Sequence, residues 1–87
     1  MTEEYVREDL RHARNLHRMR EHEGVEKIKE KYADAIASLN EIERVIILEG
    51  IIGGMHYCKI GQKYHYSESS IKSYARSAVS KIAARMK

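Results

Sequence analysis

Nine lysine, arginine and serine side chains in residues 59–77 have the chemistry needed to hold phosphates or to read base edges. Lysine and arginine neutralise phosphates and reach guanine edges, whereas serine hydroxyls are short, donate and accept, and do not obstruct close approach. Carboxylates would repel a polyanion, and Glu68 is the one acid after residue 50. The candidate contact residues are Lys59, Lys63, Ser67, Ser69, Ser70, Lys72, Ser73, Arg76 and Ser77.

Two of these residues, Arg76 and Lys72, are expected to make the main contacts. Helical geometry puts Arg76 near the middle of an exposed arc and Lys72 at its edge, with serines beside them. The serines nearest the start of this helix would meet base edges or phosphates, whereas Lys59 and Lys63, in the preceding segment, would hold the phosphate backbone. Glu68 can interact favourably with the positive end of the helix dipole, or it can accept a hydrogen bond from a cytosine amino group. We favour the first role.

The distribution of charge divides the chain into two parts. Residues 1–50 hold 12 acids and nine lysines or arginines, whereas residues 51–87 hold one acid and seven lysines or arginines. The net charge therefore changes from −3 to +6, which agrees with the total of +3. A C-terminal part with so little negative charge favours contact with a polyanion such as duplex DNA.

Length and composition restrict the class of protein. A chain of 87 residues forms at most one domain with a small core. Pro, Trp and Phe are absent, and Glu, Lys, Arg, Ala and Ile dominate, which is typical of an all-α protein. The longest apolar run, VIIL, is too short to span a membrane, and the single Cys58 excludes an internal disulfide. We expect a cytoplasmic protein with no membrane contact, in which Cys58 is small and partly buried.

Residues 1–38 are expected to form a helical extension. The charged segment 3–23 carries one thin apolar stripe at helical spacing, made of Val6, Leu10, Ala13 and Leu16. This stripe is too narrow for an intramolecular core, which favours a homodimer formed through the extension. Gly24 is the expected break before a second amphipathic helix at 25–38. Whether the two segments make one bent rod or a hairpin stays open.

An apolar core helix is expected after residue 39. Asn40 can accept from the backbone at its start while the side chain of Glu43 reaches back, which is a capping box. Gly53 and Gly54 are expected to end this helix. Its core residues are expected to be Ile42, Val45, Ile46, Leu48 and Ile52, with Ile47 and Ile51 beside them.

Two further helices, at about 57–64 and 68–85, carry the signals of a helix-turn-helix. Ser67 is a good N-cap for the second of them. Where two such helices cross, only a small side chain fits, and Gly61 occupies that place. The turn needs a residue in the left-handed conformation, and His65 falls there. The second helix is expected to face the core with Ile71, Ala75, Ala78 and Ile82.

Residues 39–86 resemble region 4 of the sigma-70 class. That family has a leucine and an acid before an apolar helix, an isoleucine in the first helix of the pair, a serine opening the recognition helix, and apolar-lysine and lysine-apolar pairs within it. The matching positions are Leu39, Glu41, Gly54, Tyr57, Ile60, Ser67, Ile71, Lys72, Ala78, Lys81 and Ile82. The positions that depart from the pattern are His56, Gly61, Tyr64 and His65.

The resemblance implies a three-helix DNA-binding module at 39–87, preceded by the extension at 1–38. A complete sigma factor needs a further module that the extension cannot hold, so the chain resembles the small phage and prophage transcription regulators of the RinA and ArpU type. These act on duplex DNA near a phage promoter, in a bacterial or phage-infected cell. A homodimer would place two recognition helices on half-sites ~34 Å apart, whereas recruitment of RNA polymerase would allow a monomer on an asymmetric site.

The extension and the overall function each leave alternatives. The extension would form a dimer, contact RNA polymerase or another protein, or stay a weakly packed charged helix. The same fold would also suit a small terminase subunit, which binds packaging DNA and forms rings. A third possibility is a protein-interaction module that binds polymerase or a sigma factor and has no DNA affinity of its own.

Catalysis, metals and cofactors find no support in the sequence. There is no glycine-rich phosphate loop, nucleophile elbow or paired-carboxylate motif, so we expect no enzyme activity. The N-terminal histidines stand five residues apart, which turns each by about 140° from the last on a helix. His56, Cys58 and His65 have no spacing typical of metal ligands.

Overall fold

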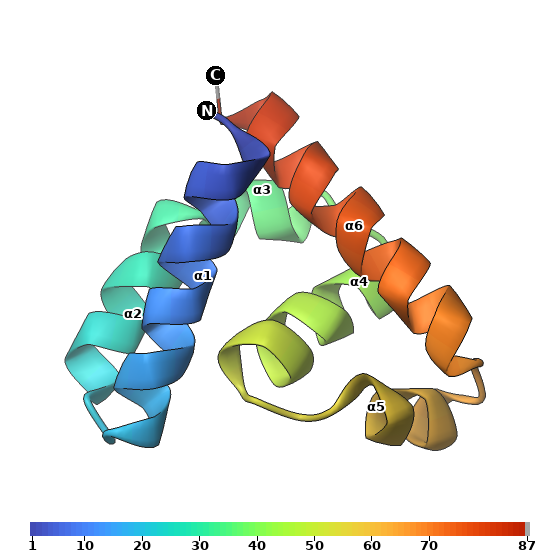
Figure 1. Cartoon of the computed structure of the whole chain (residues 1–87). Helices are drawn as coiled ribbons and strands as arrows, with labels where there is room; N and C mark the ends of the chain where they lie inside the picture. Colours follow the sequence, from blue (N-terminus) through green and yellow to red (C-terminus); the bar gives the residue numbers. More distant parts are fainter. Residues whose placement is uncertain (87) are drawn as a thin grey trace.

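The computed structural model describes residues 1–86, and every regular element in them is a helix (Figure 1). The predicted all-α class is therefore confirmed. Within this range no helix combines the length and the apolar character needed to cross a membrane. In chain order the elements are α1 (Glu3–Arg18), α2 (His22–Lys31), α3 (Ala33–Ala37), α4 (Glu41–Val45), the π-helix η1 (Ile46–Ile52), α5 (Tyr57–Tyr64) and α6 (Glu68–Arg85).

The extension is a helical hairpin, in which α1 and α2 run antiparallel (Figure 1). The break lies at residues 19–21, where Arg20 has a φ of 60°, and not at Gly24 as the sequence predicted. Gly24 instead lies inside α2, where a Cβ would stand 2.9 Å from Cδ1 of Leu16. The glycine therefore marks a close approach between two helices and does not interrupt either of them.

The helix expected at 25–38 is divided at Tyr32, which separates α2 from α3 with φ −107° and ψ 9°. The ring of Tyr32 is fully buried, and its hydroxyl donates a hydrogen bond to the Asp9 carboxylate of α1. The Lys31 ammonium donates to the same carboxylate at 2.7 Å. Burial and the Asp9 charge both raise the pKa of Tyr32, so the phenol remains a donor. This cluster attaches α1 to the α2–α3 junction.

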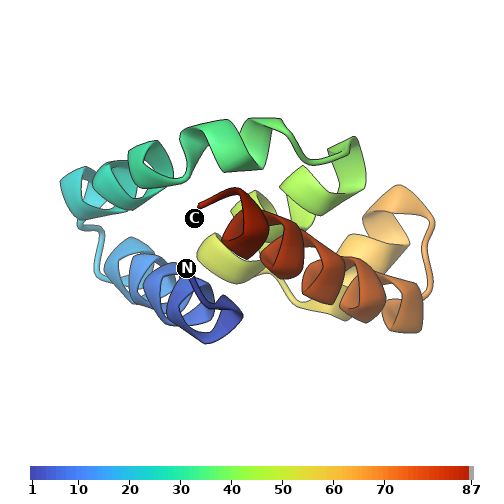
Figure 2. The same cartoon turned by 90° about the horizontal axis from the view of Figure 1, so that it is seen from above.

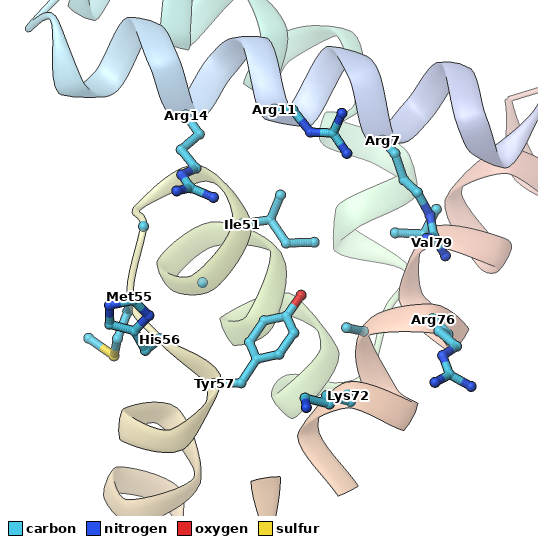
Figure 3. Close-up of a pocket in the computed structure, with 13 residues that line it drawn as sticks. Arg7, Arg11, Arg14, Ile51, Met55, His56, Tyr57, Lys72, Arg76 and Val79 are labelled. Carbon is cyan, nitrogen blue, oxygen red and sulfur yellow. The ribbon is translucent and has the colours of Figure 1, made fainter. Parts of the chain in front are cut away.

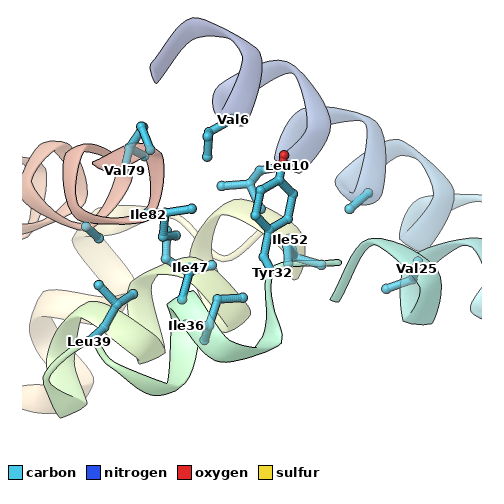
Figure 4. Packing of buried hydrophobic residues seen from close by; sticks show 14 residues of the cluster. Val6, Leu10, Val25, Tyr32, Ile36, Leu39, Ile47, Ile52, Val79 and Ile82 are labelled. Carbon is cyan, nitrogen blue, oxygen red and sulfur yellow. The ribbon is translucent and has the colours of Figure 1, made fainter. Parts of the chain in front are cut away.

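The apolar stripe of α1 is part of the main core, which corrects the expectation that it is too narrow for an intramolecular role. Val6, Leu10 and Ala13 are 0% exposed. The last turns of α6 and the π-helix cover the stripe, so residues from both ends of the chain share one cluster (Figure 4). Its larger members outside α1 are Val25, Tyr32, Ile36, Leu39, Ile47, Ile52, Val79 and Ile82.

The capping box of α4 is present as predicted. Asn40 Oδ1 accepts from the Glu43 N–H at 2.9 Å, and Glu43 Oε1 accepts from the Asn40 N–H at 3.2 Å. After α4 the helix widens into η1, and the Gly53 N–H donates to the carbonyl of Leu48, five residues back. Gly53 is the C-cap, which confirms that the glycines end the helix.

The widening changes which side chains of this helix are buried. Hydrogen bonds to the fifth preceding residue align residues five apart, so Ile47 and Ile52 both enter the main core. Ile46 turns to a second cluster, between η1, α5 and the first half of α6. Leu48 is 36% exposed and is not a core residue, contrary to the sequence prediction, which assumed α-helical spacing.

The two last helices have the bounds that the sequence predicted. Ile60 of α5 packs with Ile46, Ile71 and Ala75 in the second cluster. Seen from above, α2 and α3 follow one edge of the molecule, while α6 runs between its middle and the lower right of the view (Figure 2). This placement puts the first half of α6 next to α5, and its second half over the core shared with α1.

Candidate nucleic-acid interface

The turn between α5 and α6 has the local geometry expected from the sequence. His65 adopts φ 65° and ψ 44°, the left-handed conformation. A Cβ on Gly61 would collide with the carbonyl oxygen of Tyr66, and the Tyr66 N–H donates to the Gly61 carbonyl at 2.8 Å. Ser67 caps α6 and accepts from the Ser70 N–H at 3.1 Å. These contacts hold the start of α6 at a defined angle to α5.

The predicted core face of α6 is confirmed, since Ile71, Ala75, Ala78 and Ile82 are all buried. On the opposite arc Ser69, Ser73 and Arg76 are exposed. Two other candidate serines, Ser67 and Ser70, form the N-cap of α6, in which the Ser67 hydroxyl also donates to Ser70 Oγ at 2.9 Å. Ser70 is half-buried at the edge of the arc.

The three candidate lysines are all exposed but differ in their partners. Lys63 Nζ lies 2.9 Å from Glu49 Oε1, and the Tyr64 hydroxyl donates to Oε2 of the same carboxylate at 2.7 Å. Hydrogen bonds from Tyr64 and Lys63 lower the pKa of Glu49 and keep it ionised, so Lys63 is neutralised locally. Lys72 Nζ is 3.8 Å from Glu68, an exposed pair of small net energy that a phosphate could replace. Within residues 1–86 Lys59 has no ion pair.

Ser77 faces the protein and not the exposed arc. It lies beside Glu43, which is 1% exposed and which also accepts from Lys81 Nζ at 2.9 Å. Burial alone would raise the pKa of Glu43, but hydrogen bonds from Lys81, Asn40 and Ser77 outweigh burial and hold the pKa below its usual value. The Glu43 carboxylate therefore joins the start of α4 to the second half of α6.

We expect Glu43→Gln to reduce the free energy of unfolding at pH 7 by about 1–3 kcal/mol. This loss is smaller than for a fully buried ion pair, because water reaches Lys81 and screens its charge. A folded-state pKa below the unfolded value of about 4.3 gives stability that is present above pH ~5 and lost on acidification. The difference between wild type and variant should therefore shrink below pH ~4. Urea unfolding from pH 3 to 7 measures it, with exposed Glu41→Gln as control. An equal difference at pH 3 and pH 7 would contradict this role.

A further group of cations, outside the nine candidate residues, lies on α1 and faces α6. Arg7, Arg11 and Arg14 line one side of an open cleft of about 510 Å³, and Lys72 and Arg76 line the other (Figure 3). We call this feature the arginine cleft. No carboxylate is among the described residues that line it. The rest of its lining comes from the end of η1, the η1–α5 connection, the start of α5 and the middle of α6, and includes Ile51, Met55, His56, Tyr57 and Val79.

The signal for the arginine cleft was present in the sequence but masked by neighbouring acids. Arginines at positions 7, 11, 14 and 18 follow the spacing of one helix face. Glu8 and Asp9 stand between Arg7 and Arg11 in the sequence and offset the positive charge of this segment. In the structure Asp9 is turned away to Lys31 and Tyr32, on the side of α1 that meets α2.

The histidine, cysteine and acidic side chains of the described residues do not gather into a metal-ion site. Residues 1–86 contain no group of three His, Cys, Asp or Glu side chains that could hold a metal ion. Cys58 is exposed, which corrects the expectation that it is partly buried, because α5 packs on η1 and α6 through Ile60 and Gly61 instead. No protein-family model, curated protein or solved structure matches this chain.

Proposed function

We propose that this protein is a sequence-specific DNA-binding regulator of transcription, in which α5 and α6 act as a helix-turn-helix and α6 enters the major groove. The observation that carries the proposal is the exposed arc of α6. It combines Ser69, Ser73 and Arg76 with Lys72 at its edge, and Glu68 is the one acid in the helix. Such an arc can approach base edges without repulsion from carboxylates.

The rigid junction between α5 and α6 supports the same function. Recognition of a base sequence needs side chains held in one register against the groove, and this in turn needs a fixed angle between the two helices. The close approach at Gly61 and the left-handed His65 restrict that angle. The free N–H groups at the start of α6 would add a favourable site for a backbone phosphate.

The resemblance of residues 39–86 to region 4 of the sigma-70 class gives the biological setting of the proposal, which is control of phage or prophage genes. In this proposal one chain acts as a monomer on an asymmetric site. The stripe that favoured a dimer, centred on Leu10, is buried within a single chain, so the structural reason for pairing through residues 1–38 no longer applies.

The test is a fluorescence-anisotropy titration of duplex DNA over a salt series. We expect Arg76→Ala and Lys72→Ala each to weaken binding. Each should also reduce the slope of log K against log salt by about 0.9, because each removes one positive charge that contacts a phosphate. Both side chains are exposed, so the thermal unfolding temperature should change little.

The matched control is Lys27→Ala, which removes the same charge from α2, where Lys27 is exposed and forms an ion pair with Glu23. This variant should bind DNA as wild type does. The proposal fails if the wild type has no affinity for duplex DNA at low salt, or if Arg76→Ala and Lys27→Ala behave alike.

A further inference from the structure

We infer that the arginine cleft binds phosphate groups, and that its occupant is the sugar–phosphate backbone of the DNA strand beside the groove that α6 enters. This inference rests on the proposed function. It assigns α1 to the DNA-binding surface, as a second row of contacts provided by Arg7, Arg11 and Arg14.

The first argument is that the cleft holds unneutralised positive charge. Every ion pair within residues 1–86 is made by a lysine, so none of Arg7, Arg11, Arg14 and Arg76 is paired there. Like charges that face one another across a cleft repel, and folding brings these side chains together without a protein anion between them. A bound anion would relieve that repulsion.

The second argument concerns the kind of anion. Guanidinium groups present planar pairs of N–H donors that match the oxygens of a phosphate. Tyr57 stands between the two sides of the cleft with its hydroxyl directed towards α1 (Figure 3). Burial raises the pKa of Tyr57 more than the charges of Arg7 and Arg14 lower it, so the phenol keeps its proton. The cleft therefore offers hydrogen-bond donors from three directions, which suits a phosphate.

The third argument favours an extended polymer over a small phosphorylated molecule. The arginine face of α1 continues past the cleft to Arg18, so the row from Arg7 to Arg18 is about 16 Å long at 1.5 Å per residue. A mononucleotide in the cleft would leave the end of this row unused. A nucleic-acid strand passes one phosphate after another and can use its whole length.

The fourth argument is continuity with the exposed arc of α6. Arg76 and Lys72 belong both to that arc and to the lining of the cleft. A strand that meets these two side chains at the edge of the major groove is therefore already at the mouth of the cleft. The arginines of α1 lie on its other side and would hold the same strand.

The test compares three variants in the DNA titration. Arg11→Ala with Arg14→Ala removes two charges from the α1 side of the cleft. Lys27→Ala with Lys29→Ala removes two charges from α2, where both lysines form exposed pairs with acids. Arg76→Ala reports on α6. We expect the Arg11/Arg14 variant to bind about tenfold more weakly or worse, with a salt slope lower by about two units, and the Lys27/Lys29 variant to bind nearly as wild type does.

The outcomes separate this inference from the proposed function. If Arg76→Ala weakens binding while the Arg11/Arg14 and Lys27/Lys29 variants behave alike, the assignment of the cleft is wrong and the function of α6 stands. If the wild type does not bind duplex DNA at all, the proposed function fails and the inference fails with it. Arg11→Gln with Arg14→Gln, in which both residues remain good helix formers, should reproduce the alanine result if charge is the cause.

A second arm distinguishes the backbone from a free phosphorylated ligand. Calorimetric titration of the wild type with ATP and with inorganic phosphate at 150 mM salt should show no saturable binding comparable to that of DNA. Tight one-to-one binding of ATP that is lost in the Arg11/Arg14 variant, together with unchanged DNA affinity, would overturn the assignment to the DNA backbone.

Discussion

Replacing Leu10 by alanine is expected to remove about 2–5 kcal/mol from the free energy of unfolding. Leu10 is 0% exposed and lies in the cluster that joins α1, the π-helix and the last turns of α6 (Figure 4). A chain of this length has roughly 4–13 kcal/mol of stability in total, so the loss is a large share of it. The unfolding temperature should fall by at least about 10 °C, measured by circular dichroism.

The comparison variant for this prediction is Met19→Ala, because Met19 ends α1 but is 69% exposed. Its effect should stay within about 0.5 kcal/mol. Hydrogen exchange adds a sharper test, since the shared core predicts that Leu10→Ala lowers the protection of amides in the second half of α6 as well as in α1. If only residues 1–38 lose protection, the extension folds separately and its packing does not stabilise α6.

Replacing Gly61 by alanine is expected to cost about 1–3 kcal/mol of stability and to reduce DNA affinity by more than that loss of folded protein explains. The added Cβ would collide with the carbonyl oxygen of Tyr66, which is backbone, so the turn itself must move. Movement of this turn changes the angle between α5 and α6 and misplaces the exposed arc. Urea unfolding and DNA titration at a temperature where the variant is folded measure the two effects.

Gly24→Ala provides the matched control, because it adds the same methyl group inside α2. The atom in its way is Cδ1 of Leu16, the end of a flexible side chain, at 2.9 Å. Alanine also favours the helix over glycine by about 0.5–1 kcal/mol, which offsets the adjustment of Leu16. We expect a change close to zero in stability and none in DNA binding. An equal cost at both glycines would show that the Gly61 turn is not specially constrained.

Features that depend on a few neighbouring residues were predicted from the sequence. The capping box of Asn40 and Glu43, the N-cap at Ser67 and the left-handed His65 are all made within three or four residues, and each matches the structure. The bounds of α5 and α6 match for the same reason. The core face of α6 also matches, because a regular helix repeats its faces with a fixed period.

Features that depend on distant partners were predicted poorly. The stripe of Leu10 looked too narrow for a core because its width was judged without the residues that cover it, which lie far along the chain in η1 and in the last turns of α6. Leu48 was placed in the core because α-helical spacing was assumed where the chain adopts a π-helix. The break of the extension was assigned to Gly24, although the glycine serves to let α2 approach α1.

For this protein the sequence by itself determined the helical class, the caps of α4 and α6, the bounds of α5 and α6 and the acid-poor face of α6, because each follows from local backbone and side-chain preferences. Only the tertiary structure decided that α1 packs on α6, that Asp9 turns to α2, and that the α1 arginines face Arg76 across a cleft. The reason is physical, since charges of one sign come together only when burial elsewhere fixes their helices in place.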